Sequence, residues 1–209
     1  MTTSPDRPAA ADLESVLADI RACRACLGRL PHTPRPVVHV FPETRLLICG
    51  QAPGRRVHES GLPFTDPSGD RLRDWLGVDY ATFYADPRIG VAAQAFCYPG
   101  TAPPKNGRSG GDHPPPKRCA ELWRPRLLAE LPDVELTLLV GGYAQAWALG
   151  DRAKPNMTET VRAWREYAPS ILPLPHPSWR NTAWLGRNPW FEAEVLPCLR
   201  ERVRGMLAA

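Results

Sequence analysis

Four short apolar segments constrain the fold of this chain more than any other feature. They lie at Arg45–Gly50 (RLLICG), Ile89–Phe96 (IGVAAQAF), Glu135–Gly141 (ELTLLVG) and Ser170–Leu174 (SILPL). Each has the length of a strand and is apolar on both faces, as in parallel strands that are covered on both sides. Segments with helical periodicity separate them, so the sequence predicts an α/β fold.

The helical segments complete this picture. Helices are predicted at Leu13–Cys26, Gly69–Leu76, Lys117–Leu131, Gly142–Leu149, Thr158–Arg165 and Pro189–Met206. Asp12 and Ser68 stand where helix caps are expected. A chain of 209 residues suits one domain of this kind. We therefore predict a flexible tail at residues 1–10 and a single three-layer domain at 11–209, with a central, mainly parallel four-stranded sheet flanked by helices.

The composition excludes several classes of protein. Hydrophobic residues make up 43% of the chain, which argues against global disorder, and the 25 prolines indicate long ordered loops. No stretch approaches the ~20 apolar residues of a membrane span. The polar, Pro-rich start lacks an apolar signal core, so we expect a cytoplasmic protein with reduced thiols. The net charge of +4 is weak support for a polyanionic partner.

Unusual loops follow three of the four predicted strands. They contain GQAPG after the first strand, CYPG after the second and LPHPSW after the fourth. In parallel sheets, ligands bind beyond the carboxyl ends of the strands. Gly and Pro are common in loops, so any one of these loops is ordinary, but three such loops at the same edge of a sheet predict a binding site.

Two of these loops resemble those of a known family. Gly50–Phe64 reads GQAPGRRVHESGLPF and Leu174–Ser178 reads LPHPS. In order and spacing, these segments resemble the uracil-DNA glycosylase superfamily, and the branch that carries an iron–sulfur cluster is the nearest match. The resemblance implies a DNA-repair glycosylase that flips a deaminated base, uracil or a related one, out of DNA and hydrolyses its N-glycosidic bond.

The resemblance also implies roles for individual residues. Phe64 would stack on the flipped base, His176 would donate to the departing base, and Gln51 would position water. His58 is a further candidate for the chemistry, as a nucleophile or proton shuttle, although a solvated basic turn explains it equally well. The remaining residues expected to bind substrate are Gly50, Ala52, Pro53, Gly54, Gln94 and Ser178.

Three positions depart from the pattern of the family. The first loop carries Gln51, which cannot act as a general base, and His58 replaces an acidic residue. Ala93, with Gln94 beside it, replaces the Asn that reads the uracil edge. A DNA-binding paralogue without catalysis and an enzyme that acts on free nucleotides with the same fold are therefore alternative hypotheses.

Four cysteines occur in the order found in the glycosylases that carry a cluster. Cys23 and Cys26 form C-x2-C, and Cys97 and Cys119 follow after a long gap. Four thiolates suit an iron–sulfur cluster or a tetrahedral zinc site. The resemblance favours a structural [4Fe-4S] cluster, with zinc or no metal as alternatives. The remaining cysteines, Cys49 and Cys198, are predicted to be buried apolar residues.

Basic and aromatic side chains near these loops are candidates for DNA contacts. Arg55 and Arg56 follow the first loop, and Trp179, Arg180 and Arg187 follow His176. The expected partner is DNA with a damaged or deaminated base, bound by a monomer that makes no membrane contact. Two further tryptophans lie nearby. Trp190 is predicted to pack the closing helix, and Trp184 is compatible with either packing or a DNA contact.

Overall fold

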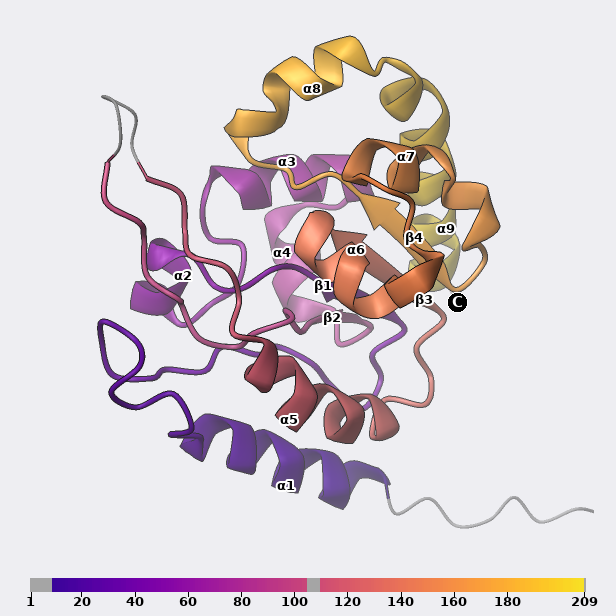
Figure 1. Cartoon of the computed structure of the whole chain (residues 1–209). Coiled ribbons are helices and arrows are strands. Elements are labelled where there is room, and N and C mark those ends of the chain that lie inside the picture. The colour runs from indigo at the N-terminus through magenta and orange to yellow at the C-terminus, as the bar shows by residue number, and fades with distance from the viewer. Residues whose placement is uncertain (1–8, 105–109, 209) are drawn as a thin grey trace, which may run out of the picture.

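The computed structural model describes residues 9–104 and 110–208 and contains a four-stranded sheet. The strands are β1 (Leu46–Cys49), β2 (Ile89–Val91), β3 (Leu136–Val140) and β4 (Ile171–Leu174). Their order is β2-β1-β3-β4, and every pair of neighbours is parallel (Figure 1). The predicted α/β class and parallel sheet are confirmed.

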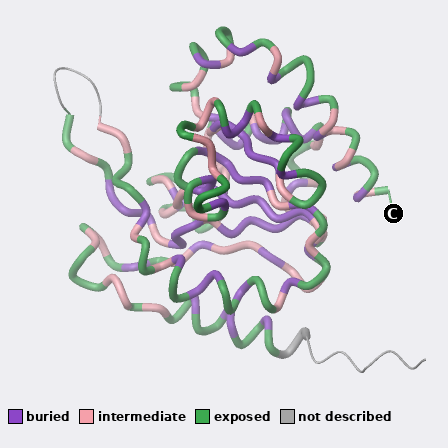
Figure 2. The backbone as a smooth tube through the Cα atoms, turned by 45° about the vertical axis from the view of Figure 1, so that its right-hand side comes forward, coloured by how far each residue is buried: buried purple, intermediate pink, exposed green. Residues whose placement is uncertain are grey.

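Side chains of successive strand residues point to opposite faces of the sheet, and both faces are covered. In β1, Leu46 and Ile48 belong to one buried cluster, whereas Leu47 and Cys49 belong to clusters on the other face. Covered strands need no polar residues, which explains why the strand segments are apolar throughout. Figure 2 shows the buried strands at the centre and exposed residues on the outer helices.

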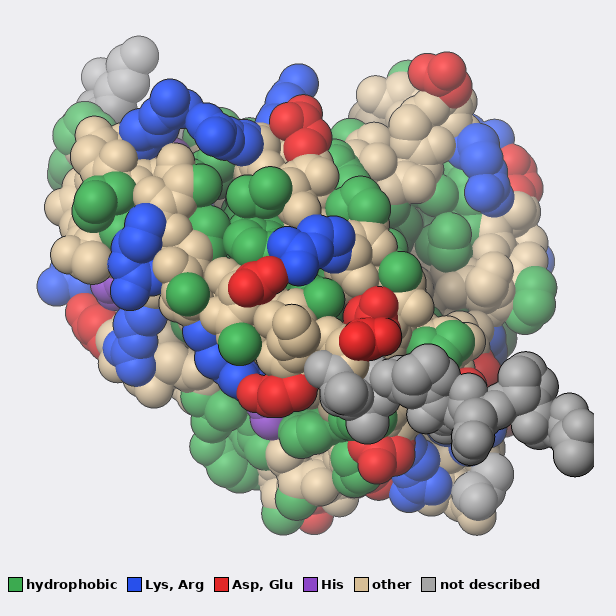
Figure 3. All heavy atoms as spheres, turned by 90° about the horizontal axis from the view of Figure 1, so that it is seen from below, with side chains coloured by type: hydrophobic (Ala, Val, Ile, Leu, Met, Phe, Trp, Pro, Cys, Tyr) green, Lys and Arg blue, Asp and Glu red, His purple; other side chains and the backbone are tan. Residues whose placement is uncertain are grey.

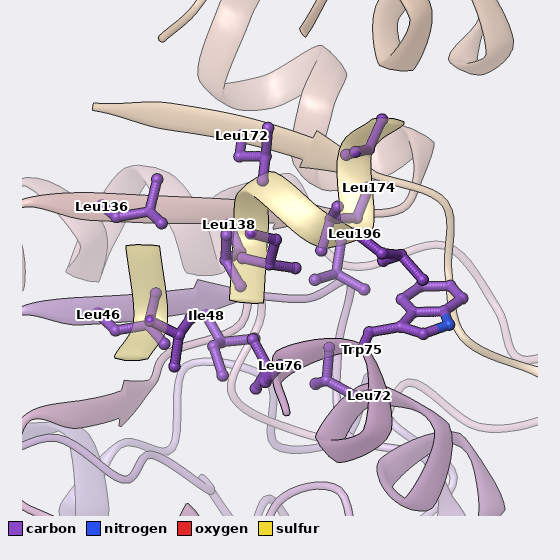
Figure 4. Close-up of a cluster of buried hydrophobic side chains, with 14 of the residues drawn as sticks. Leu46, Ile48, Leu72, Trp75, Leu76, Leu136, Leu138, Leu172, Leu174 and Leu196 are labelled. Carbon is purple, nitrogen blue, oxygen red and sulfur yellow. The ribbon is translucent and has the colours of Figure 1, made fainter. Parts of the chain in front are cut away.

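The larger cluster lies between the sheet and helices from three parts of the chain. These helices are α3 (Pro67–Leu76), α4 (Tyr80–Ala85) and α9 (Leu196–Ala208). Trp75 of α3 and Leu196 of α9 pack beside the leucines of β1, β3 and β4 (Figure 4). Burying one such side chain completely contributes ~1.5–3 kcal/mol. Helices α7 (Met157–Arg162) and α8 (Thr182–Arg187) close the outer end of this cluster.

Three other helices cover the opposite face. Helices α1 (Ala9–Ala22) and α5 (Lys117–Ala129) pack together over Leu47 of β1. Helix α6 (Gly142–Leu149) covers Cys49 and its neighbours. The described residues thus form the three predicted layers of helices, sheet and helices (Figure 1). Among them, no helix is both long and apolar enough to cross a membrane.

Several predicted helix boundaries are wrong, for local reasons. Helix α1 begins at Ala9 and not after Asp12, because three alanines, the best helix formers, extend it upstream. It ends at Ala22, so Cys23–Cys26 lies in the turns that follow. Helix α3 begins one residue before Ser68, because Pro67 occupies its first position and Asp66 becomes the cap. The predicted tail lies largely outside the described residues, apart from the first two residues of α1.

The structure also contains helices where loops were expected. Helix α2 (Arg55–Ser60) lies within the first glycine-rich loop, and α8 occupies much of the predicted loop at Pro175–Asn188. The predicted closing helix contains a π-helical segment, Phe191–Val195, ahead of α9. Strand β2 is three residues long, shorter than predicted. Such short elements span too few turns to show a clear hydrophobic period.

Candidate functional site

A pocket of about 570 Å³ opens at the carboxyl ends of the strands. Its walls come from the loops after β1, β2 and β4 and from the chain segment between β2 and α5. This volume is in the range of small-molecule binding pockets. Residues predicted from the sequence that line it are Gly50, Gln51, Ala52, Pro53, Gly54, Phe64, His176, Ser178, Trp179 and Arg180.

A wider depression of about 1190 Å³ lies at the opposite edge of the sheet. Its charged side chains include Arg45, which pairs with Glu135, and Arg88, which pairs with Asp86. Both arginines are thus engaged in ion pairs within the protein. We therefore take the pocket at the carboxyl ends of the strands as the candidate site.

Phe64 forms one wall of this pocket. The tip of its ring lies 3.7 Å from where a Cβ on Gly50 would stand, and its edge faces the ring of Phe83. Its φ of 55° is unusual for a residue with a side chain. A conformation of this kind costs about 1–3 kcal/mol and persists only where the surroundings impose it.

The surroundings of Phe64 do impose that conformation. Arg73, which is buried, donates to the carbonyl oxygen of Phe64 at 3.1 Å and pairs with Asp70 at 2.6 Å. The phenol of Tyr84 donates to the preceding carbonyl, that of Pro63, at 2.7 Å. A Cβ on Gly69 would lie only 1.8 Å from the carbonyl oxygen of Phe64, so α3 approaches this closely because residue 69 is glycine.

His176 lies at the end of β4 with its ring orientation fixed. Its Nδ1 accepts a hydrogen bond from the backbone N–H of Ser178 at 3.2 Å, and its carbonyl accepts one from Asn181 at 2.7 Å. Gly141, whose φ of +89° favours glycine, lies beside this side chain, and a Cβ there would stand 3.5 Å from the Cβ of His176. Burial lowers the pKa of His176, and the carboxylates of Asp66 and Asp112 partly oppose this. The imidazole is therefore neutral near pH 7, with its proton on Nε2.

Gln51 connects the first loop to two other walls. Its side-chain amide makes a long hydrogen bond of 3.5 Å to the carbonyl of His113. Its backbone carbonyl accepts from Ala95, and that of Gly50 accepts from Gln94. The loop after β1 is thus held against the segments that follow β2.

Two carboxylates in the pocket were not predicted from the sequence. Asp66 is the N-cap residue of α3, yet its side chain makes no capping hydrogen bond and it lines the pocket. Asp112 lies 61 residues after Gln51 in the chain. No local pattern distinguishes it from an ordinary loop aspartate. Other unpredicted residues of the lining include Ser68, Thr101, Tyr143 and Asn181.

The sequence of the chain matches the model of the Uracil DNA glycosylase superfamily over residues 38–200. The matched region includes both predicted loops and every strand of the sheet. The chain belongs to the uracil-DNA glycosylase superfamily. Membership implies a DNA glycosylase-like role on a DNA substrate, as members are typically uracil-DNA N-glycosylases. Neither the base that is recognised nor the iron–sulfur branch follows from the match.

Two predicted pocket residues of this glycosylase-family chain lie elsewhere. The ring of His58 is 4.2 Å from that of His32 and does not line the pocket. Burial, followed by the nearby His32 and Arg35, lowers the pKa of His58. Gln94 is 4% exposed and also lies outside the lining, and its Oε1 has no hydrogen-bond partner among the described residues. Ala93 lines the pocket instead, at the position where the family resemblance led us to expect an Asn.

The predicted DNA-binding residues divide between the rim of the pocket and the surface beyond it. Trp179 lines the rim and is 72% exposed, with the guanidinium of Arg180 5.7 Å from its ring centre. Arg55, Arg56 and Arg187 are exposed but do not line the pocket. Figure 3 shows Lys and Arg gathered on the flank where α2 lies in Figure 1. This distribution suits contacts with phosphates outside the pocket.

Two further tryptophans near this loop are structural. Trp184 is buried, donates through its indole nitrogen to Thr158 at 2.7 Å and packs against Phe191. Trp190 packs edge-on against Trp184. The prediction for Trp190 is confirmed, and the alternatives for Trp184 are resolved in favour of the core.

The four cysteines of the predicted metal site line a second pocket. It lies between α1, α5 and the segment after β2, and its other walls include Ile20, Pro36, Phe96 and Trp123. Burial, together with the neighbouring thiols, raises the pKa of Cys97 to about 12 and that of Cys119 to about 11. Among the described residues, however, no three Cys, His, Asp or Glu side chains form a group compact enough to hold one metal ion. Cys49 is buried in the sheet, and Cys198 is partly buried beside the larger core cluster.

Proposed function

We propose that this protein is a DNA-repair glycosylase that removes a deaminated base from DNA by hydrolysis of the N-glycosidic bond. One observation carries the proposal: a single pocket combines an aromatic wall, Phe64, with a neutral imidazole of fixed orientation, His176. Both lie at the strand ends of a chain that belongs to the uracil-DNA glycosylase superfamily. A base inside the duplex is out of reach, so it must leave the stack and enter this pocket.

The two side chains serve different stages of the reaction. Phe64 binds the flipped base by stacking, before any bond breaks. As the bond between the sugar and the base nitrogen lengthens, negative charge develops on the base oxygen. The Nε2–H of His176 donates to that oxygen, and the hydrogen bond strengthens as the charge grows. A neutral imidazole can perform this role, and the buried setting of His176 favours the neutral form.

Two residues of the pocket bear on its specificity. The amide of Gln51 can orient water or contact the base, although it cannot remove a proton. Ala93 presents no polar group at the position where an Asn was expected. A pocket without that hydrogen-bonding group discriminates less sharply between bases. We therefore propose that the substrates are deaminated bases as a class and not one particular base.

The second pocket supports a structural [4Fe-4S] cluster, ligated by Cys23, Cys26, Cys97 and Cys119. A single ion needs thiolates that converge on one point, and the described residues lack such a group. A four-iron cluster is larger and is ligated by four thiolates spaced around it, and all four cysteines line one pocket. The free volume of this pocket is only about 20 Å³, so the four thiolates would have to move apart to hold the cluster. The cluster would tie α1 to the segment between β2 and α5 and would supply no step of the hydrolysis.

The test is cleavage of single- and double-stranded oligonucleotides that each carry one uracil, hypoxanthine or xanthine. We expect an abasic site at one or more of these bases, revealed by strand breakage in alkali. The His176→Asn variant, purified in parallel, controls for a contaminating glycosylase and should be strongly impaired. Wild-type protein that cleaves no modified strand would contradict the proposal.

The same experiment separates the alternatives. The first loop contributes no carboxylate to the pocket, because its Glu59 pairs with Arg55 outside the lining, and this favours a binding protein without catalysis as the second candidate. Tight binding of a modified strand without cleavage would support that candidate. Neither binding nor cleavage would favour an enzyme that acts on free nucleotides.

A further inference from the structure

Between Cys97 and Cys119, the described residues on either side of 105–109 pair as an antiparallel hairpin beside the pocket. Thr101 pairs with Asp112 in an antiparallel bridge, flanked by hydrogen bonds from Ala102 to Gly111 (2.9 Å) and from His113 to Gly100 (2.8 Å). In Figure 1 the described parts of this segment run side by side along α2. The hairpin therefore brings residues far from Gln51 in the sequence to the mouth of the same cavity.

The hairpin is attached to the walls on both sides of Asp112. Arg180, from the loop after β4, donates to the carbonyl of Gly110 at 3.1 Å. Gln51, from the loop after β1, donates to the carbonyl of His113. Residues 110–113 are thus held by both of the loops that form the pocket.

The carboxylate of Asp112 has a defined position. Its Oδ1 accepts a hydrogen bond from the hydroxyl of Thr101 at 2.8 Å, which leaves Oδ2 facing the first loop. Oδ2 lies 3.6 Å from where a Cβ on Gly54 would stand, so this carboxylate oxygen is close to the backbone of the first loop. Asp112 therefore places a negative charge beside the first loop, whose own carboxylate, Glu59, pairs with Arg55 outside the pocket.

The exposure of Asp112 indicates which part of a nucleotide it would meet. The stacking ring of Phe64 and the imidazole of His176 lie in the interior and would hold the base. The sugar stays attached to the DNA backbone, so it must remain at the mouth. Asp112 is exposed and lines that mouth. The other unpredicted carboxylate, Asp66, is half-buried at the start of α3, so it is less accessible from the mouth than Asp112.

We propose that Asp112 is the catalytic carboxylate of this protein, supplied by the hairpin in place of the first loop. This inference rests on the proposed glycosylase function. As the bond between C1′ and the base nitrogen breaks, its electrons leave with the base, and positive charge develops on the sugar. The oxygen of a water molecule then bonds to C1′ while one of its protons passes to the carboxylate of Asp112. The base anion, held by Nε2 of His176, takes a proton from solvent.

The test measures binding of two abasic-site analogues in otherwise identical DNA. One carries a pyrrolidine, which is cationic like the charged sugar, and the other carries a neutral tetrahydrofuran. Asp112→Asn should weaken binding of the pyrrolidine strand on the order of 10- to 100-fold, the scale of one hydrogen bond to a charged group. Binding of the tetrahydrofuran strand should change by no more than about twofold, since that sugar has no charge to lose. Asp151→Asn, which removes an exposed carboxylate outside the pocket, should leave both affinities unchanged.

A second measurement follows the chemistry. Asp112→Asn should lower the single-turnover cleavage rate by about 10²–10⁴, the usual contribution of a general base. Thr101→Val keeps the charge but removes the hydrogen bond that orients it. Its loss should be smaller than that of Asp112→Asn. Unchanged urea unfolding midpoints for both variants would exclude a fold defect.

The analogue experiment also keeps the two proposals apart. Wild-type protein that cleaves no modified strand would contradict the glycosylase function, yet its preference for the cationic analogue would still report on Asp112. Equal affinity of wild type and Asp112→Asn for the pyrrolidine strand would overturn the assignment. Loss of that affinity in Asp66→Asn alone would transfer the role to Asp66.

Discussion

The backbone N–H of Ser178 donates a hydrogen bond to Nδ1 of His176, with 3.2 Å between the two nitrogens. Because Nδ1 accepts, the proton of the neutral ring lies on Nε2. The short loop after β4 thereby selects the tautomer that can donate to an oxygen in the pocket. Ser178 does this through its backbone, so its hydroxyl remains available to substrate.

The first prediction tests whether the Nε2–H donor of His176 contributes to the cleavage rate. In His176→Asn the shorter side chain can still accept from Ser178, but it lacks the donor at Nε2. We expect the single-turnover cleavage rate to fall on the order of 10²–10³, the scale for loss of one such donor. Ser178→Ala keeps the backbone N–H, so it should preserve this rate and weaken DNA binding instead. A rate for His176→Asn equal to that of wild type would remove His176 from the chemistry.

The second prediction concerns pH and stability. Burial lowers the pKa of His176 below the value of 6.5 expected in the unfolded chain. Below pH 6.5 the unfolded chain therefore binds a proton that the folded protein binds only at lower pH, and the free energy of unfolding decreases as pH falls. Urea unfolding between pH 7.5 and 5 should show this decrease, and His176→Asn should show a shallower one. His39 and His58, whose pKa values are also lowered, should maintain part of the slope. An identical slope in the variant would contradict the assignment.

The third prediction tests the close approach of α3 to Phe64. Gly69→Ala would place a methyl group 1.8 Å from the carbonyl oxygen of Phe64, so the backbone must shift. We expect a loss of about 1–3 kcal/mol in the free energy of unfolding, typical of overpacking, and weaker capture of the flipped base. Gly205→Ala in α9 is the matched control, because a Cβ there meets nothing within 4 Å. It should stabilise the protein by about 0.5–1 kcal/mol.

The fourth prediction distinguishes a charged from an uncharged contact at the rim. Arg180→Ala should weaken DNA binding and reduce the dependence of log K on log salt by about one, because one phosphate contact is lost. Trp179→Ala should weaken binding by about tenfold without changing that slope, since stacking releases no counterions. Arg165→Ala, whose side chain pairs with Glu194 away from the pocket, should change neither. Binding that is indifferent to salt in the wild type would count against a DNA substrate.

The fifth prediction concerns the cysteine pocket. Protein purified without oxygen should be brown and absorb at ~400 nm, where thiolate-to-iron charge transfer lies. Cys97→Ser should lose this absorption, whereas Cys198→Ser, outside the pocket, should keep it. Colourless protein with one equivalent of zinc would assign the site to zinc. Protein without either metal would end the cluster proposal.

The sequence predicted the layers of the fold because its signals are local. A strand such as Leu46–Cys49 needs only a few consecutive apolar residues, and β-branched or leucine-rich runs next to glycine are readable without the rest of the chain. The helices that were missed lack such a local signal. Helices of six residues, such as α2 and α8, are too short for periodicity and depend on the tertiary contacts that bury Val57 and Trp184.

The same division holds for the pocket. By itself the sequence predicted that Gln51, Phe64 and His176 would lie at one edge of the sheet, because Gln51 and His176 each stand two residues after a parallel strand and Phe64 ends the loop that begins at Gly50. Only the tertiary structure decided that His58 and Gln94 turn away and that Asp66 and Asp112 turn in. For Asp112 the physical reason is distance along the chain. Its position depends on a hairpin fixed by hydrogen bonds to Gln51 and Arg180, about 60 to 70 residues away, and no local pattern encodes such contacts.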